Sequence, residues 1–154
     1  MQTEWLSLLP LILLAAGGSV LFCLGAMWRR APKVLLFGVA VLTCIASGGS
    51  ALFFGNLTGH FAGLLVVDGF SSFYTVLFAA ITLITLLFSY QYAKHRDFAG
   101  DEFLGIILFA AAGMVLIAAS IHWLAFFLGL EMLSISLLCL LLSIEGTHLG
   151  SKRR

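Results

Sequence analysis

Charged residues are scarce in this chain. Only 10% of its 154 residues are Asp, Glu, Lys or Arg, and the formal net charge is +1, whereas about a quarter of an ordinary soluble domain is charged. The small net charge argues against a nucleic-acid-binding protein, because such proteins carry a large basic excess on one face. Hydrophobic residues make up 62% of the chain instead. A soluble domain of this length cannot bury that much apolar surface, so we predict an integral membrane protein.

Reactive and metal-binding groups are also few. The cysteines are Cys23, Cys44 and Cys139, and their odd number and wide spacing predict neither a disulfide framework nor a zinc site. We interpret them as small packing residues in apolar helices. The sequence has no glycine-rich phosphate loop, nucleophile triad or metal-ligand cluster. We therefore expect this chain to bind no cofactor.

Five long apolar stretches remain, and each is long enough to cross a bilayer as a helix. About 20 mostly apolar residues span a hydrocarbon core of roughly 30 Å. The predicted spans are residues 5–27, 34–54, 70–92, 103–120 and 122–143. The first span is not interpreted as a cleaved signal peptide, because it begins without a cation and its apolar run is too long. The expected fold is an all-α bundle of about five transmembrane helices.

The basic residues predict how this bundle is oriented. All eight Lys and Arg residues fall in the first connection, the third connection or the carboxyl-terminal tail. Cytoplasmic loops retain Lys and Arg. We therefore expect the amino terminus outside and the carboxyl terminus in the cytoplasm, as an odd number of crossings also requires. The expected location is the cell inner (plasma) membrane.

Small residues recur at helical spacing in three of the predicted spans. They are Ala15, Ser19 and Cys23 in the first span and Thr43, Ser47 and Ala51 in the second; in the fourth, Gly105 and Gly113 flank Phe109 at this spacing, and Ala110, Ala111 and Ala112 add further small side chains. Small side chains let helices approach closely in lipid, where packing drives helix association. We predict that these stripes are helix–helix contacts.

One acidic residue lies inside a predicted span. Glu131 stands about ten residues into the fifth span, near the bilayer midplane at about 1.5 Å per residue. A charge at that depth costs about 2.5–3.5 kcal/mol, so such residues usually face a bundle interior or a water pocket. Ser134 follows three residues later on the same face and is a candidate to orient the carboxyl group. We predict a proton relay at Glu131; the alternative is a protonated carboxyl group that makes a structural hydrogen bond between helices.

His122 is a second candidate, on the predicted outer turn between the fourth and fifth spans. Histidine changes its charge near neutral pH and can exchange protons with water. The alternative, a solvated histidine with only a structural role in the turn, is favoured. Asp68 lies just before the third span, and we interpret it as a helix cap at the interface rather than as a relay.

Three stretches of the sequence resemble a known family. They are Asp-Gly-Phe-Ser-Ser-Phe-Tyr at residues 68–74, Asp-Glu-Phe at 101–103, and the segment 116–134 that contains Glu131. They are similar to subunit N of bacterial NADH-quinone oxidoreductase (respiratory complex I), in the same order and over essentially the whole chain. The glutamate motif is shared with the related antiporter-like subunits and cation/proton antiporters.

The resemblance implies a membrane-arm subunit that helps couple electron transfer from NADH to quinone to proton translocation. It implies that other subunits carry FMN and the iron–sulfur clusters, and that the partners are the other membrane subunits of the complex. Residues 1–120 would be the first four helices, and residues 121–154 would begin the antiporter-like translocating core.

In that family the fifth-helix glutamate pairs with a lysine on a later helix. Glu131 matches the glutamate, but the sequence ends before the helix that would supply the lysine. The resemblance thus covers an amino-terminal portion, and we expect a truncated product or one piece of a split subunit. Two other functions stay open: a structural or assembly subunit without ion transport, and a part of a cation/proton antiporter or membrane-bound hydrogenase.

Overall fold

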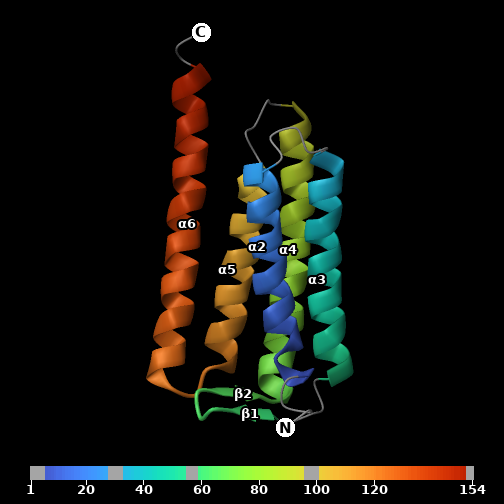
Figure 1. Ribbon diagram of the computed structural model, residues 1–154, viewed down its shortest axis with the longest axis vertical. Helices are drawn as coiled ribbons and strands as arrows, with labels where there is room; N and C mark the ends of the chain where they lie inside the picture. Colours follow the sequence, from blue (N-terminus) through green and yellow to red (C-terminus); the bar gives the residue numbers. More distant parts are fainter. Residues whose placement is uncertain (1–5, 28–32, 55–58, 96–100, 152–154) are drawn as a thin grey trace.

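A computed structural model of the chain describes residues 6–27, 33–54, 59–95 and 101–151. Within these residues, five long helices run side by side (Figure 1). They are α2 (Leu9–Met27), α3 (Lys33–Phe54), α4 (Gly69–His95), α5 (Asp101–Ala119) and α6 (Trp123–Ser151). The all-α bundle predicted from the sequence is confirmed. Which end of the bundle faces the cytoplasm stays a prediction.

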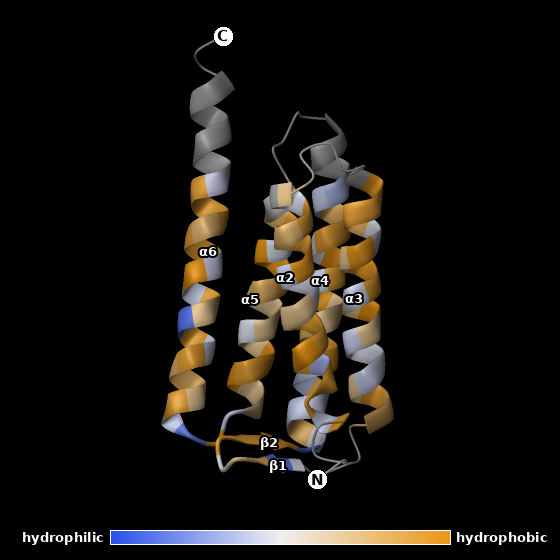
Figure 2. Cartoon of the chain, viewed as in Figure 1, coloured by the Kyte–Doolittle hydropathy of each residue, from blue (hydrophilic) through white to orange (hydrophobic). Residues whose placement is uncertain are grey.

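The lengths of the helices follow the apolar stretches closely. Three helices of the described chain are long and apolar enough to cross a membrane, over Val34–Phe54, Gly69–Tyr90 and Trp123–Ser143. The apolar helices Leu9–Gly25 and Phe103–Ala119 are shorter. Hydrophobic residues cover most of the height of the bundle (Figure 2), as expected for helices whose solvent is lipid. Helix α6 continues to Ser151, past the predicted end at residue 143.

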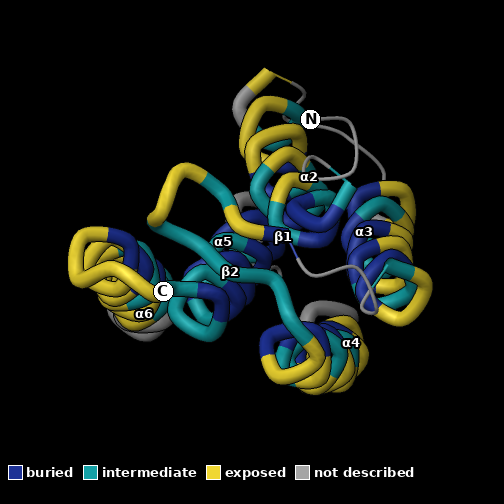
Figure 3. The backbone as a smooth tube through the Cα atoms, turned by 90° about the horizontal axis from the view of Figure 1, so that it is seen from below, coloured by how far each residue is buried: buried dark blue, intermediate teal, exposed yellow. Residues whose placement is uncertain are grey.

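The core lies between α2, α3, α4 and α5. Its most deeply buried large side chains come from all four helices: Leu14, Leu21, Leu36, Leu86 and Leu108. Helix α5 is central, because it packs against α2, α4 and α6 (Figure 3). Helix α6 lies at the edge of the bundle and packs mainly on α5. Only 17% of the α6 span is buried, against 33% of the α3 and α4 spans.

The small-residue stripes of the second and fourth spans are helix contacts, as predicted. Thr43, Ser47 and Ala51 are all buried on α3, and the Ser47 hydroxyl donates a hydrogen bond to the Pro10 carbonyl oxygen of α2 at 3.0 Å. Gly105 of α5 faces α2, where a Cβ atom on it would lie 3.2 Å from the Gly18 carbonyl oxygen.

The prediction for the first span was wrong. Ser19 and Cys23 are exposed on α2, and α2 instead contacts its neighbours through Gly17 and Gly18. A Cβ atom at Gly17 would clash with the Thr43 side chain of α3, and one at Gly18 would press on Phe109 of α5. A residue without a Cβ lets two backbones approach more closely than Ala, Ser or Cys does. Of the cysteines, Cys44 is buried as expected, whereas Cys23 and Cys139 are exposed and are not core packing residues.

A short hairpin, which we did not predict, lies in the connection between α3 and α4. Strands β1 (Gly59–Phe61) and β2 (Leu65–Val67) pair antiparallel. Ala62 (φ 50°) and Gly63 (φ 67°) make the turn, and left-handed conformations at two successive residues suit the twist of a tight hairpin. The Ile121 N–H donates to the Leu64 carbonyl oxygen at 3.0 Å. This bond ties the hairpin to the α5–α6 turn, so the hairpin crosses one end of the bundle (Figure 1).

Candidate functional site

Glu131 lies on α6 and points away from the rest of the bundle. The residues of α6 that are buried against α5 are Ala125, Gly129 and Ser136. Glu131 follows Gly129 by two residues, which turns it by about 200° around the helix at 100° per residue. Glu131 is accordingly exposed. A hydrophilic patch halfway along the otherwise apolar α6 is visible on the side away from α5 (Figure 2).

Glu131 lies in the middle part of the apolar span of α6, and its place in the bilayer stays a prediction. The apolar span of α6 covers Trp123–Ser143. At about 1.5 Å per residue, Glu131 lies about 12 Å from the first of these residues and about 18 Å from the last. Carboxyl groups at that depth in a membrane usually pair with a polar partner or face a water-filled cavity.

That partner is absent from the described part of the chain. Glu131 makes no hydrogen bond and no ion pair with any described residue. Ser134 is exposed on the same side of α6, but no hydrogen bond joins it to Glu131 within the described residues. The proposed orienting role of Ser134 stays a prediction.

The orientation of α6 is set by a close contact between two glycines. A Cβ atom on Gly113 of α5 would lie 3.0 Å from the Gly129 carbonyl oxygen and 3.0 Å from the Leu133 backbone nitrogen. A Cβ atom on Gly129 would lie 3.1 Å from the Gly113 carbonyl oxygen. The two backbones therefore touch at this crossing. Because this contact holds one face of α6 against α5, the opposite face carries Glu131 outward.

His122 lies in the turn before α6, where the sequence predicted it. Its side chain is exposed, and its Nδ1 atom accepts a hydrogen bond from the Leu124 N–H at 3.2 Å. This bond satisfies one of the free N–H groups at the start of the helix. His122 is nine residues from Glu131, or about 13 Å along the helix. The structure does not bring the two candidates together, and it places His122 as a cap.

Asp68 is a helix cap, as the sequence predicted. Its carboxylate oxygen Oδ1 accepts from the Ser71 N–H at 2.8 Å, and the Ser71 hydroxyl oxygen accepts from the Asp68 N–H at 3.0 Å. Such reciprocal bonds satisfy two backbone donors at once. They explain why α4 begins at Gly69, directly after the hairpin.

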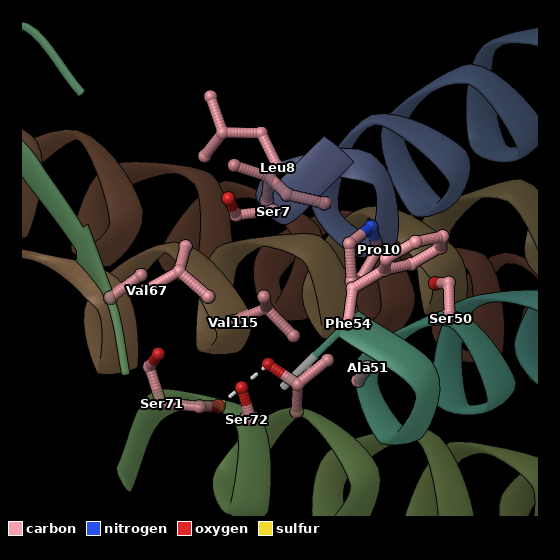
Figure 4. A pocket seen from close by; sticks show the side chains of 13 residues that line it. Ser7, Leu8, Pro10, Ser50, Ala51, Phe54, Val67, Ser71, Ser72 and Val115 are labelled. Atoms are coloured by element: carbon pink, nitrogen blue, oxygen red, sulfur yellow. Dashed lines mark hydrogen bonds between the residues drawn. The ribbon is translucent and has the colours of Figure 1, made fainter. Parts of the chain in front are cut away.

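A cavity that we did not predict lies at the same end of the bundle. Several hydroxyl groups are part of its mainly apolar lining, among them Ser50 of α3, Ser72 and Thr75 of α4, and Ser7, which precedes α2 (Figure 4). A Ser-Ser-x-x-Thr pattern at residues 71–75 is visible in the sequence. That pattern does not show that Ser50 lines the same cavity.

Metal-binding side chains do not gather in the described residues. No group of three or more His, Cys, Asp or Glu residues there is close enough to hold a metal ion.

Comparison with known proteins gives one consistent result. No family model matches the chain. NADH-quinone oxidoreductase subunit N 2 of Koribacter versatilis is 34% identical over 142 residues, covering 86% of this chain and 29% of the relative. Subunit N 1 of Solidesulfovibrio magneticus is 32% identical over 143 residues, covering 93% of this chain and 29% of the relative. Subunit N 2 of Rhizobium meliloti is 27% identical over 132 residues, covering 84% of this chain and 28% of the relative.

A solved structure agrees with these relatives. A chain of respiratory complex I from Thermus thermophilus with bound aureothin is similar with a TM-score of 0.70 and 28% sequence identity. The match covers 85% of this chain and 28% of the Thermus chain. The chain therefore spans less than a third of the length of the proteins that it matches.

Proposed function

Since the chain is a homologue of NADH-quinone oxidoreductase subunit N, we propose that it works in the membrane arm of such a complex. Its role there is to help couple electron transfer from NADH to quinone to proton translocation. FMN and iron–sulfur clusters belong to partner subunits in this proposal. The membrane is the inner (plasma) membrane of a bacterial cell.

The observation that supports this proposal most directly is the position of Glu131. It lies at mid-span, on the open face of α6, and it makes no bond with the described residues. A purely structural carboxyl group would be expected to bond to a neighbouring helix of the same bundle. An acid without a partner in its own bundle is consistent with a proton relay whose second group is supplied when the complex assembles.

The partner that this face requires is a helix with a basic side chain at the same depth. Acidic groups inside a membrane usually pair with a basic group or face a water-filled cavity. No Lys or Arg falls within the five predicted spans of this chain, so a basic partner must come from another polypeptide segment. Proton transfer between that partner and Glu131 is what a relay needs.

Two substitutions at Glu131 test the proposal. Glu131→Gln keeps the shape and a hydrogen bond but cannot titrate, whereas Glu131→Asp still titrates with a shorter reach. In the assembled complex, Gln should abolish coupled proton movement through this subunit and Asp should retain part of it. The measurement is NADH-driven proton uptake into inverted membrane vesicles, with assembly checked on native gels.

A matched control is Thr85→Ala, which removes an exposed polar group from the α4 span, away from α6, and leaves Glu131 unchanged. It should pump far better than Glu131→Gln. Full proton uptake by an assembled Glu131→Gln complex would refute the relay and favour a structural subunit. Failure of the chain to co-purify with any NADH-oxidising complex would refute the membrane-arm role itself.

A further inference from the structure

The cavity at the hairpin end of the bundle contains a buried hydroxyl group without a partner. Ser72 is only 8% exposed, and within the described chain its Oγ atom is buried and makes no hydrogen bond. Figure 4 shows Ser72 on α4 beneath Val115 of α5, with Ser50, Ala51 and Phe54 of α3 on the adjoining side. A buried polar group that is left unpaired is costly, so this hydroxyl group needs an explanation.

The usual partner of such a serine is already occupied. Buried hydroxyls in a helix commonly donate to the carbonyl oxygen four residues earlier, as Thr75 does to Ser71 at 2.8 Å. For Ser72 that acceptor is the Asp68 carbonyl oxygen. This oxygen already accepts from the Ser72 N–H at 3.0 Å and from the Ser71 hydroxyl at 3.2 Å. A carbonyl oxygen has two lone pairs, so the helix cap leaves the Ser72 hydroxyl without its local acceptor.

Two other hydroxyls that line the cavity already donate their protons elsewhere. Thr75 donates its proton to the Ser71 carbonyl, and Ser50 donates its proton to the Ser47 carbonyl at 2.8 Å. Their oxygen atoms therefore have only acceptor capacity left. The cavity lining thus combines an unpaired donor at Ser72 with acceptor capacity at Thr75 and Ser50.

A water molecule complements this arrangement, because it accepts one hydrogen bond and donates two. The cavity has an accessible volume of about 20 Å³, and a site of about 10–15 Å³ is enough for one water. Buried waters typically make about three hydrogen bonds to groups that are otherwise unsatisfied. We propose that this cavity is a binding site for a single resident water, which accepts from Ser72 and donates to Thr75.

This water would occupy the space where the start of α4 meets the end of α3, next to the hairpin at this end of the bundle. The proposal concerns the stability of that end and is independent of the relay at Glu131.

Solid-state NMR of the full chain in lipid bilayers tests for the water directly. Magnetisation from water should reach the Ser72 and Thr75 signals early. It should not reach Ser136, a buried serine whose hydroxyl already donates to the Met132 carbonyl at 2.7 Å. Ser72→Val fills the cavity with methyl groups and should abolish the transfer to Thr75. Absence of transfer at Ser72 in the parent chain, or its persistence at Thr75 in Ser72→Val, overturns the proposal.

The sign of a stability change gives an independent test. If the cavity holds water, Ser72→Ala removes a partner of that water and should lower the melting temperature by on the order of 2 °C. If the cavity is dry, the same change removes an unpaired hydroxyl group and leaves the melting temperature equal or higher, which contradicts the proposal. A sodium ion is the competing occupant. The melting temperature of the parent chain would then be higher in sodium chloride than in choline chloride, and Ser72→Ala would remove this difference. That result would show that a cation occupies the cavity and would overturn the proposal.

Discussion

The contact between Gly113 and Gly129 leads to a quantitative prediction, because an added methyl group there meets backbone atoms. In Gly113→Ala the new Cβ would lie 3.0 Å from the Gly129 carbonyl oxygen and 3.0 Å from the Leu133 nitrogen, whereas ordinary contacts begin at 3.4 Å. Backbone atoms cannot turn aside as a side chain can. Helix α6 must therefore move outward by at least about 0.4 Å, the difference between 3.0 and 3.4 Å.

Two opposing effects decide the outcome of this substitution. Forcing an extra methyl group into a packed contact costs about 1–3 kcal/mol, while replacing Gly by Ala inside a helix gains up to about 1 kcal/mol. The control is Gly49→Ala on α3, where no atom of a neighbouring element lies within 4 Å of a Cβ built there. This variant should show only the stabilisation that Ala gives a helix. We expect Gly113→Ala to have a free energy of unfolding lower than that of Gly49→Ala by about 1–3 kcal/mol.

The assay is unfolding of both purified variants in mixed micelles by titration with a denaturing detergent. Spin labels on α5 and α6 should also show a wider separation in Gly113→Ala and an unchanged one in Gly49→Ala. Equal unfolding free energies for the two variants would refute the argument that these backbones touch.

Three further predictions concern orientation, capping and assembly. With the native cysteines replaced, a cysteine at position 60 should react with a membrane-impermeant reagent added from outside, whereas one at position 95 should not. Labelling of position 95 from outside would show that the predicted orientation is reversed. Asp68→Ala should destabilise the chain by about 1 kcal/mol and Asp68→Asn by much less, because Asn still caps a helix; equal thermal melts of the two variants would exclude the capping role. The purified chain should melt at a higher temperature with its partner subunits than alone, since these would cover the open face of α6; identical melting temperatures would argue against that cover.

The sequence predicted the elements of the fold well because lipid allows few alternatives. A chain in hydrocarbon must satisfy its backbone internally, so a long apolar run becomes a helix. The run predicted at residues 34–54 is matched by the observed apolar span Val34–Phe54. The prediction was poorest for the connection between α3 and α4, which lies outside the apolar spans. The hairpin is too short to show a clear strand pattern, and it depends on a hydrogen bond from Ile121, far away in the sequence.

Which face of each helix is buried was harder to predict. Glu131 stood out because a carboxyl group is unusual at that depth, and this reasoning needs no structure. Its direction could not be obtained the same way, because apolar residues lie all around α6 and no continuous polar face shows which side is buried. The same ambiguity explains the error on α2, where Ser19 and Cys23 have the right spacing for a contact but lie on the wrong face.

Sequence alone therefore established a membrane bundle with one acid at mid-span, since hydropathy and the cost of a buried charge are properties of local segments. Tertiary structure decided the rest. The glycine contact between α5 and α6 turns Glu131 away from its own bundle, and the packing of α3 against α4 places Ser50 in the lining of the cavity that also contains the unpaired hydroxyl of Ser72. Both features arise where backbones from distant parts of the chain approach one another, and no local pattern of residues specifies that distance.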